Sequence, residues 1–153
     1  YVISPPIRSK QDQEALWLAC AEGTVDVIST DHCPFNTIGQ KDVGINDFTK
    51  IPNGAGGIEN RLQLLYTYGV LTGKISLQQF VGLTSTNAAR IFDLYPQKGA
   101  VAVSSDADLL IWNREAKSVI SVETQAQQCD ANIYNGISCQ GKTEIVLLKG
   151  KQI

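Results

Sequence analysis

One short run of β-branched residues constrains the fold more than any other feature of the chain. Residues 25–30 read Val-Asp-Val-Ile-Ser-Thr, which is typical of a strand, and helical patterns stand on both sides of them. A strand between two helices is the usual pattern of a parallel α/β arrangement, in which helices cover a sheet. The first part of the chain is therefore predicted to be α/β.

The helical patterns are short and have recognisable ends. Gly23 is a natural stop for the first helix, and Thr86 is a plausible N-cap for the last one. The first helix is expected to carry an apolar stripe made of Ala15, Leu16, Leu18 and Ala19. Helices are predicted over residues 11–22, 58–69 (ending near Gly69 or Gly73), 77–81 and 88–92. Residues 36–57 are rich in Gly, Asn, Asp and Pro and are predicted to form a long loop, which is usually functional.

The pattern changes near residue 99. Residues 109–112 and 145–148 are apolar strand runs, residues 119–122 are a weaker candidate, and residues 149–153 look like a hairpin turn with a second strand just begun. We therefore divide the chain into an α/β part, residues 1–98, and a β-rich module, residues 99–153. The α/β part is too short for a closed eight-stranded barrel, which needs about 250 residues, but has the length to supply the last segments of one.

Composition excludes several classes of partner. The 153 residues carry a formal net charge of −2, with 13 Lys and Arg scattered among 15 Asp and Glu, so no basic patch indicates nucleic acid. No apolar run approaches the length of a membrane span. Four widely spaced cysteines suggest reduced thiols in a cytoplasmic protein. The chain lacks methionine and opens on Tyr1, so both ends are expected to be cuts in a longer protein.

Asp31 is the first candidate for chemistry. It follows the predicted strand, and the carboxyl end of a strand is where a parallel barrel presents its ligands. A carboxylate there can bind a divalent metal with one oxygen and take up a proton with the other. An aspartate before Pro34 also commonly caps a turn, and spacing alone favours that simpler interpretation.

Other polar residues carry weaker signals. His32 is the single histidine and is expected to be packed or hydrogen-bonded, and nothing assigns a base to Cys33. One histidine and one aspartate cannot complete a zinc site, so any metal needs ligands from elsewhere. The glycine-rich residues 52–57 either bring the backbone close to a ligand or form an adaptable turn. The acidic pair Asp106 and Asp108 is interpreted as structural.

Six motifs follow one another along the chain. They are SPPIR (residues 4–8), TDHCPFNT (30–37), DFTKIPNG (47–54), TSTNAARIF (84–92), LYPQKG (94–99) and SDADL (105–109). Together they resemble the motifs of the dihydropyrimidinase and hydantoinase family of cyclic amidohydrolases. The DFTKIPNG stretch is the most specific, whereas the Asp-His-x-Pro element is shared with allantoinases and dihydroorotases. Ser104 is a departure, because the family usually has glycine there, and this puts a local turn in question.

The resemblance implies the C-terminal portion of a (β/α)8 amidohydrolase barrel, followed by part of a small β-sandwich. It also implies two Zn2+ ions per subunit, bridged by a carboxylated lysine, whose other ligands lie upstream of this chain. The full-length form is then expected to be a cytoplasmic homotetramer acting in pyrimidine catabolism, with no nucleic-acid or membrane partner.

The same resemblance assigns roles to three residues. Asp31 matches a metal-binding aspartate that serves as general base and then acid, and Ser4 and Asn53 match positions that hold the cyclic amide, largely through backbone groups. The implied reaction is ring opening of a dihydropyrimidine or hydantoin by a binuclear zinc hydroxide, which gives an N-carbamoyl amino acid. The chain alone is expected to be inactive.

A scaffold without catalytic activity is one alternative, and an isolated binding fragment without activity is another. Collapsin response mediator proteins share the fold and many of the motifs, but they typically replace the aspartate and the asparagine that stand here as Asp31 and Asn53. Retention of both residues favours the enzyme.

Overall fold

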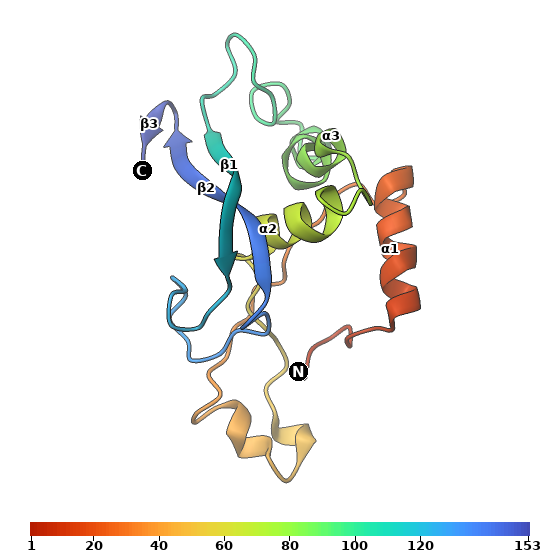
Figure 1. Ribbon diagram of the computed structural model, residues 1–153, viewed down its shortest axis with the longest axis vertical. Helices are drawn as coiled ribbons and strands as arrows, with labels where there is room; N and C mark the ends of the chain where they lie inside the picture. The colour runs from red at the N-terminus through yellow and green to blue at the C-terminus, as the bar shows by residue number, and fades with distance from the viewer.

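The structure is a computed structural model that describes residues 1–153, and it combines a helical layer with a three-stranded antiparallel sheet. Figure 1 shows the strands beside α2 and α3, with α1 on the far side of these helices and the loop around residues 36–57 extending away from the body. The helices are α1 (Lys10–Glu22), α2 (Arg61–Leu65), α3 (Leu77–Val81) and α4 (Asn87–Ile91), with the π-helical turns η3 (Tyr66–Val70) and η4 (Gly82–Thr86).

Helix α1 begins and ends at the residues that helix chemistry favours. Ser9 forms a capping box with Asp12, and Gly23 takes the left-handed conformation at the C-terminal end, so the predicted helix is confirmed. The predicted apolar stripe is wrong in part. Trp17 and Cys20 face the core, whereas Leu16 and Leu18 of the stripe are each 57% exposed.

The second group of helices is more continuous than predicted. Helix α2 continues into η3, within the helix predicted from residue 58 to Gly69 or Gly73. Helix α3 continues through η4 into α4, whereas separate helices were predicted over residues 77–81 and 88–92. Thr86 is not an N-cap: it lies inside this helical run, and its hydroxyl donates to the carbonyl of Gly99 at 2.8 Å. The true cap is Ser76, which forms a capping box with Gln79.

The strand predicted over residues 25–30 does not form. These residues form no regular secondary structure and no neighbouring strand pairs with them, and a strand exists only through its ladder. The helices hold the segment instead. The amide of Ile28 donates to the carbonyl of Leu83 at 2.9 Å, and the guanidinium of Arg61 donates to the carbonyl of Ile28 at 2.7 Å.

The sheet follows the order β1-β2-β3 and is antiparallel throughout. Strands β1 (Leu109–Val119) and β2 (Ser138–Leu148) contain the two predicted apolar runs and extend beyond them, and the turn at residues 149–150 leads into β3 (Lys151–Gln152) as expected. The separate strand over residues 119–122 is wrong, because Val119 already ends β1. The domain boundary near residue 99 stays a prediction.

The core lies between the helical layer and the sheet. Tyr66 is 1% exposed and contacts Trp112 of β1 edge-on, with ring centroids 5.6 Å apart, and Phe80 at 6.1 Å. Gly141 of β2 allows this packing. A Cβ atom there would lie 2.7 Å from both the Trp112 and the Tyr66 ring, so only glycine fits.

Candidate functional site

Three segments that are distant in sequence meet at one edge of the molecule. His32 and Ala55 form an isolated parallel bridge, in which the amide of Cys33 donates to the carbonyl of Ala55 at 3.1 Å. The amide of Gly54 donates to the carbonyl of Val2 at 3.1 Å. The backbone therefore brings the surroundings of all three candidate residues together, although their side chains come from positions up to 49 residues apart.

Asp31 stands at this edge with a free carboxylate. Its side chain is exposed and takes part in no hydrogen bond or ion pair of this chain. Asp47 shows what a turn-capping aspartate looks like here: its Oδ1 accepts from the Thr49 amide at 3.2 Å and from the Thr49 hydroxyl at 2.6 Å. The turn cap considered for Asp31 is therefore not formed, and its carboxylate remains available to a ligand.

Ser4 and Asn53 contact each other directly. The Nδ2 atom of Asn53 donates to the Oγ atom of Ser4 at 2.9 Å, and both side chains are exposed. The contact closes a link between the first residues of the chain and the glycine-rich turn. It leaves the Asn53 Oδ1 atom and the Ser4 hydroxyl proton free for a further partner.

The backbone of the turn approaches its neighbour so closely that it requires glycine. Gly54 has a φ of 155°, and a Cβ atom there would lie 2.6 Å from the carbonyl oxygen of Cys33. Of the two interpretations of residues 52–57, the close approach is realised, but the neighbour is the chain itself.

His32 is held by hydrogen bonds whose partners the sequence did not identify. Its ring is half-buried, and its Nδ1 atom accepts from the amides of Gly57 at 3.1 Å and Ile58 at 3.3 Å. The end of the glycine-rich turn therefore does not offer these two amides to a ligand. The sequence predicted only that this single histidine is packed or hydrogen-bonded, and it gave no indication that the Gly57 and Ile58 amides are the donors.

Hydrogen bonds hold the long loop, residues 36–57, near both of its ends. It contains the 3-10 turns η1 (Lys41–Gly44) and η2 (Phe48–Lys50), and Lys41 Nζ donates to the carbonyl of Pro52 at 3.1 Å. The carboxylate of Asp130 accepts from the amides of Thr37 and Ile38, the latter at 3.1 Å. These backbone hydrogen bonds lower the pKa of Asp130 below its usual value.

The residues present fit one ligand of a metal centre but not a whole one. No group of three or more His, Cys, Asp and Glu side chains converges anywhere in the chain. Asp31 is a hard oxygen donor without a competing partner, which suits Zn2+. The second residue of the element, His32, already uses one ring nitrogen as an acceptor for backbone amides.

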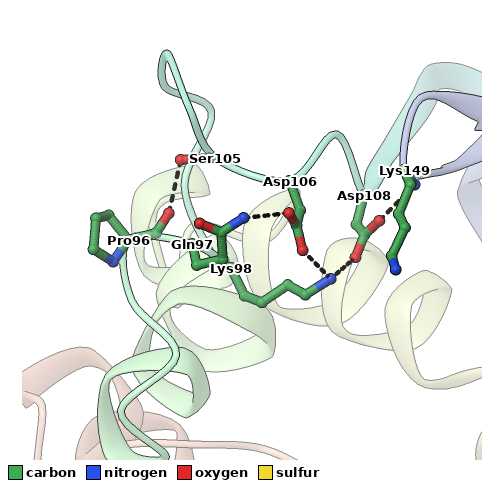
Figure 2. A network of polar contacts seen from close by, with 7 residues as sticks. All are labelled: Pro96, Gln97, Lys98, Ser105, Asp106, Asp108 and Lys149. Atoms are coloured by element: carbon green, nitrogen blue, oxygen red, sulfur yellow. Dashed lines mark hydrogen bonds and ion pairs between the residues drawn. The ribbon is translucent and has the colours of Figure 1, made fainter.

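The acidic pair later in the chain is structural, as predicted. Lys98 bridges Asp106 and Asp108, with its Nζ atom 2.7 Å from Asp106 Oδ2, and the amide of Lys149 donates to Asp108 Oδ1 at 2.7 Å. Figure 2 shows the lysine reaching across between the two carboxylates. The network joins the segment after α4 to the start of β1 and the turn after β2.

The mixed helix-and-strand fold and the motifs agree with the comparisons with known proteins. The model of the amidohydrolase family matches residues 6–153, so the chain belongs to the amidohydrolase family. None of its helices is long and apolar enough to cross a membrane.

Its relatives in that family include hydantoinases and a dihydropyrimidinase. The chain is 47% identical to a D-hydantoinase from Rhizobium radiobacter over all of its own 153 residues, and it covers 33% of that protein. It is similar to the solved structures of a D-hydantoinase from a Bacillus species (TM-score 0.95, 48% identity, 99% of this chain and 33% of that one) and of a dihydropyrimidinase from Brevibacillus agri (TM-score 0.96, 46% identity, 100% and 33%). The chain thus spans about a third of the length of these relatives.

Proposed function

We propose that the protein to which this chain belongs opens the ring of cyclic amides or imides, either 5,6-dihydropyrimidines or hydantoins, by hydrolysis to N-carbamoyl amino acids. One observation carries the proposal: Asp31 presents an exposed, unpartnered carboxylate at the edge where Ser4 and Asn53 meet. The names of the relatives, D-hydantoinase and dihydropyrimidinase, indicate the same substrate class.

The chain's own residues would divide the work between proton transfer and binding. Two Zn2+ ions, one of them held by Asp31 and the rest of their ligands supplied from outside this chain, would polarise the ring carbonyl and activate water. Asp31 would take up the proton of the attacking water and return it to the departing ring nitrogen. Ser4 and Asn53, already joined to each other, would hold the ring amide, largely through backbone groups.

The finer architecture belongs to the same proposal. Residues 1–98 would supply the last segments of a (β/α)8 barrel, and residues 99–153 part of the accompanying β-sandwich. The strand-type sequence of residues 25–30, which stays unpaired, supports this assignment, because a barrel strand needs neighbours on both sides and this chain offers none. Homotetramer formation rests on the family resemblance alone, and a cytoplasmic location rests on that resemblance and on the four widely spaced cysteines.

The alternative is a scaffold that shares the fold without the chemistry. Elemental analysis of the full-length protein, together with an assay of dihydrouracil and hydantoin opening, separates the two functions. The enzyme is expected to contain two zinc ions per subunit and to open at least one of the rings. A metal-free protein that leaves both rings intact would establish the scaffold instead.

A further inference from the structure

We propose that His32 is a positioning residue, which fixes the glycine-rich turn that follows Asn53 relative to Asp31 by accepting backbone hydrogen bonds on its Nδ1 atom. The inference rests on the proposed function and adds a residue to it. His32 touches neither substrate nor metal in this role. It sets the separation between the group that moves protons and the groups that hold the ring.

The hydrogen-bond donors define the state of the imidazole. Both partners of Nδ1 are backbone amides, Gly57 at 3.1 Å and Ile58 at 3.3 Å, and an amide can only donate. Nδ1 must therefore carry a lone pair, and the ring proton must be on Nε2. The two amides begin the helical turn that leads into α2, so His32 fixes the end of the turn as well as its backbone direction.

This contact matters because little else connects the two segments. Residues 25–33 have no strand ladder, and their pairing with the turn is one isolated bridge with a single backbone bond from Cys33 to Ala55. One more hydrogen bond, from the Arg61 guanidinium to the carbonyl of Ile28, holds the segment four residues before His32. His32 follows Asp31 directly in the chain, so its two accepted hydrogen bonds hold the residue next to the one that carries the carboxylate.

The alignment of reacting groups sets the size of the expected effect. A misplacement of about 1 Å in an active site costs up to about a hundredfold in rate. Without the acceptor, the turn that carries Asn53 is free to shift against Asp31. We expect both weaker ring binding, seen as a raised KM, and slower proton transfer, seen as a lowered kcat.

The test uses two substitutions at His32 that differ in where they place an acceptor. In His32→Asn the side-chain Oδ1 takes nearly the position of Nδ1, so both amides keep their partner. In His32→Gln the acceptor moves outward to the position of Nε2, and the amides lose it. In the full-length, zinc-loaded enzyme, kcat/KM should fall by about ten- to a hundredfold in His32→Gln and stay within about threefold of the wild type in His32→Asn.

A matched control removes a hydrogen bond from the same segment at a distance from the site. Asn87 Nδ2 donates to the carbonyl of Asp26 at 2.9 Å, and Asn87→Ala should leave kcat/KM unchanged. Zinc content should match the wild type in His32→Gln, because replacement of a metal ligand would lower it. If His32→Gln does not fold, His32→Phe provides a second variant without an acceptor but with the ring.

The other possible results of these experiments would contradict either the positioning role of His32 or the proposed function. Equal activity of the Asn and Gln variants, loss of activity in both, loss of zinc, or failure of both non-accepting variants to fold would overturn the positioning role. A wild type that opens no ring would overturn the proposed function and this inference with it. A wild type that is active and depends on Asp31, but is indifferent to His32→Gln, would overturn the inference alone.

Discussion

At the scale of single residues, the aspartates of the chain differ in what their carboxylates contact. Asp47, Asp106, Asp108 and Asp130 each accept hydrogen bonds, and these bonds lower the pKa of each carboxyl. Asp31 accepts none and lies beside the turn that carries Asn53. Asp26, Asp42 and Asp93 also accept no side-chain hydrogen bond, so the position of Asp31 beside this turn, and not its lack of a partner, makes it the candidate for chemistry.

Replacing Asp31 by Asn in the full-length enzyme should remove nearly all turnover without unfolding it. The amide keeps the size and one oxygen that can bind metal, but it cannot accept and return a proton. General acid–base catalysis typically contributes about 10²–10⁴ in rate, and weaker metal binding adds to the loss. A steady-state assay beside a thermal melt measures both. Asp26→Asn, an equally exposed aspartate of the same segment, is the control, and near-normal turnover in Asp31→Asn would sink the catalytic role.

Ser104 has a backbone conformation that is less favourable for serine than for glycine. It has a φ of 73°, in the left-handed region, where a Cβ atom costs about 1–2 kcal/mol. Ser104→Gly should raise the free energy of unfolding by about 0.5–1 kcal/mol, since the greater freedom of glycine in the unfolded chain offsets part of the gain. The urea midpoint reports the change. The neighbouring Ser105→Gly should lower stability, because it removes the hydroxyl that donates to Pro96 at 2.7 Å.

At the scale of elements, local signals were sufficient for helices and for the outer hairpin. Gly23 predicted the end of α1, and the apolar run over residues 145–148 predicted β2, because helix caps and strand patterns depend only on residues close in sequence. The strand over residues 25–30 failed because pairing is not a local property. The same limit applies to the site: motif resemblance located Asp31, whereas the bonds from Gly57 to His32 join positions 25 apart.

The ion network of Lys98 should stabilise the junction between α4 and β1 within a defined range of pH. Hydrogen bonds from Lys98 lower the pKa of Asp106 and Asp108, so their contribution is present above the usual carboxyl pKa of about 3.9 and is lost as pH falls through the lowered values. The pKa of Lys98 is raised, chiefly by Asp106, so its contribution is present below about pH 10.4 and is lost as pH rises through the raised value.

Thermal melts of Lys98→Met across pH therefore test the network. The variant should melt below the wild type between about pH 4 and 10, and the two curves should converge outside that range. Added salt should narrow the gap, because the groups are partly exposed. Lys117→Met removes an exposed lysine without an ion pair and should give no such window. If the difference in melting temperature between the wild type and Lys98→Met persisted unchanged at pH 3, the variant would have lost stability through packing and not through ion pairs.

At the scale of the whole molecule, the chain exposes more surface than a self-contained domain of its size. Its accessible area is 10261 Å², whereas a folded monomer of 16.6 kDa exposes about 7,600 Å². The excess resembles the area that an obligate interface buries. It includes large apolar side chains that nothing in the chain covers, among them Val103, which is 98% exposed, and Leu16 and Leu18 on α1.

The chain of residues 1–153 on its own should therefore self-associate and should open neither ring. Helix α1 is apolar on both sides, with Trp17 and Cys20 turned inward and Leu16 and Leu18 each 57% exposed on the outside, and such a helix is normally covered. Introducing Glu at both leucines should weaken association, as seen by sedimentation, while the helical signal in circular dichroism is kept. Glu at Gln11 and Gln13 adds the same charge to exposed polar positions of the same helix and should leave association unchanged. A monodisperse wild-type monomer that unfolds cooperatively would contradict the prediction, because it would mean that the exposed area needs no cover.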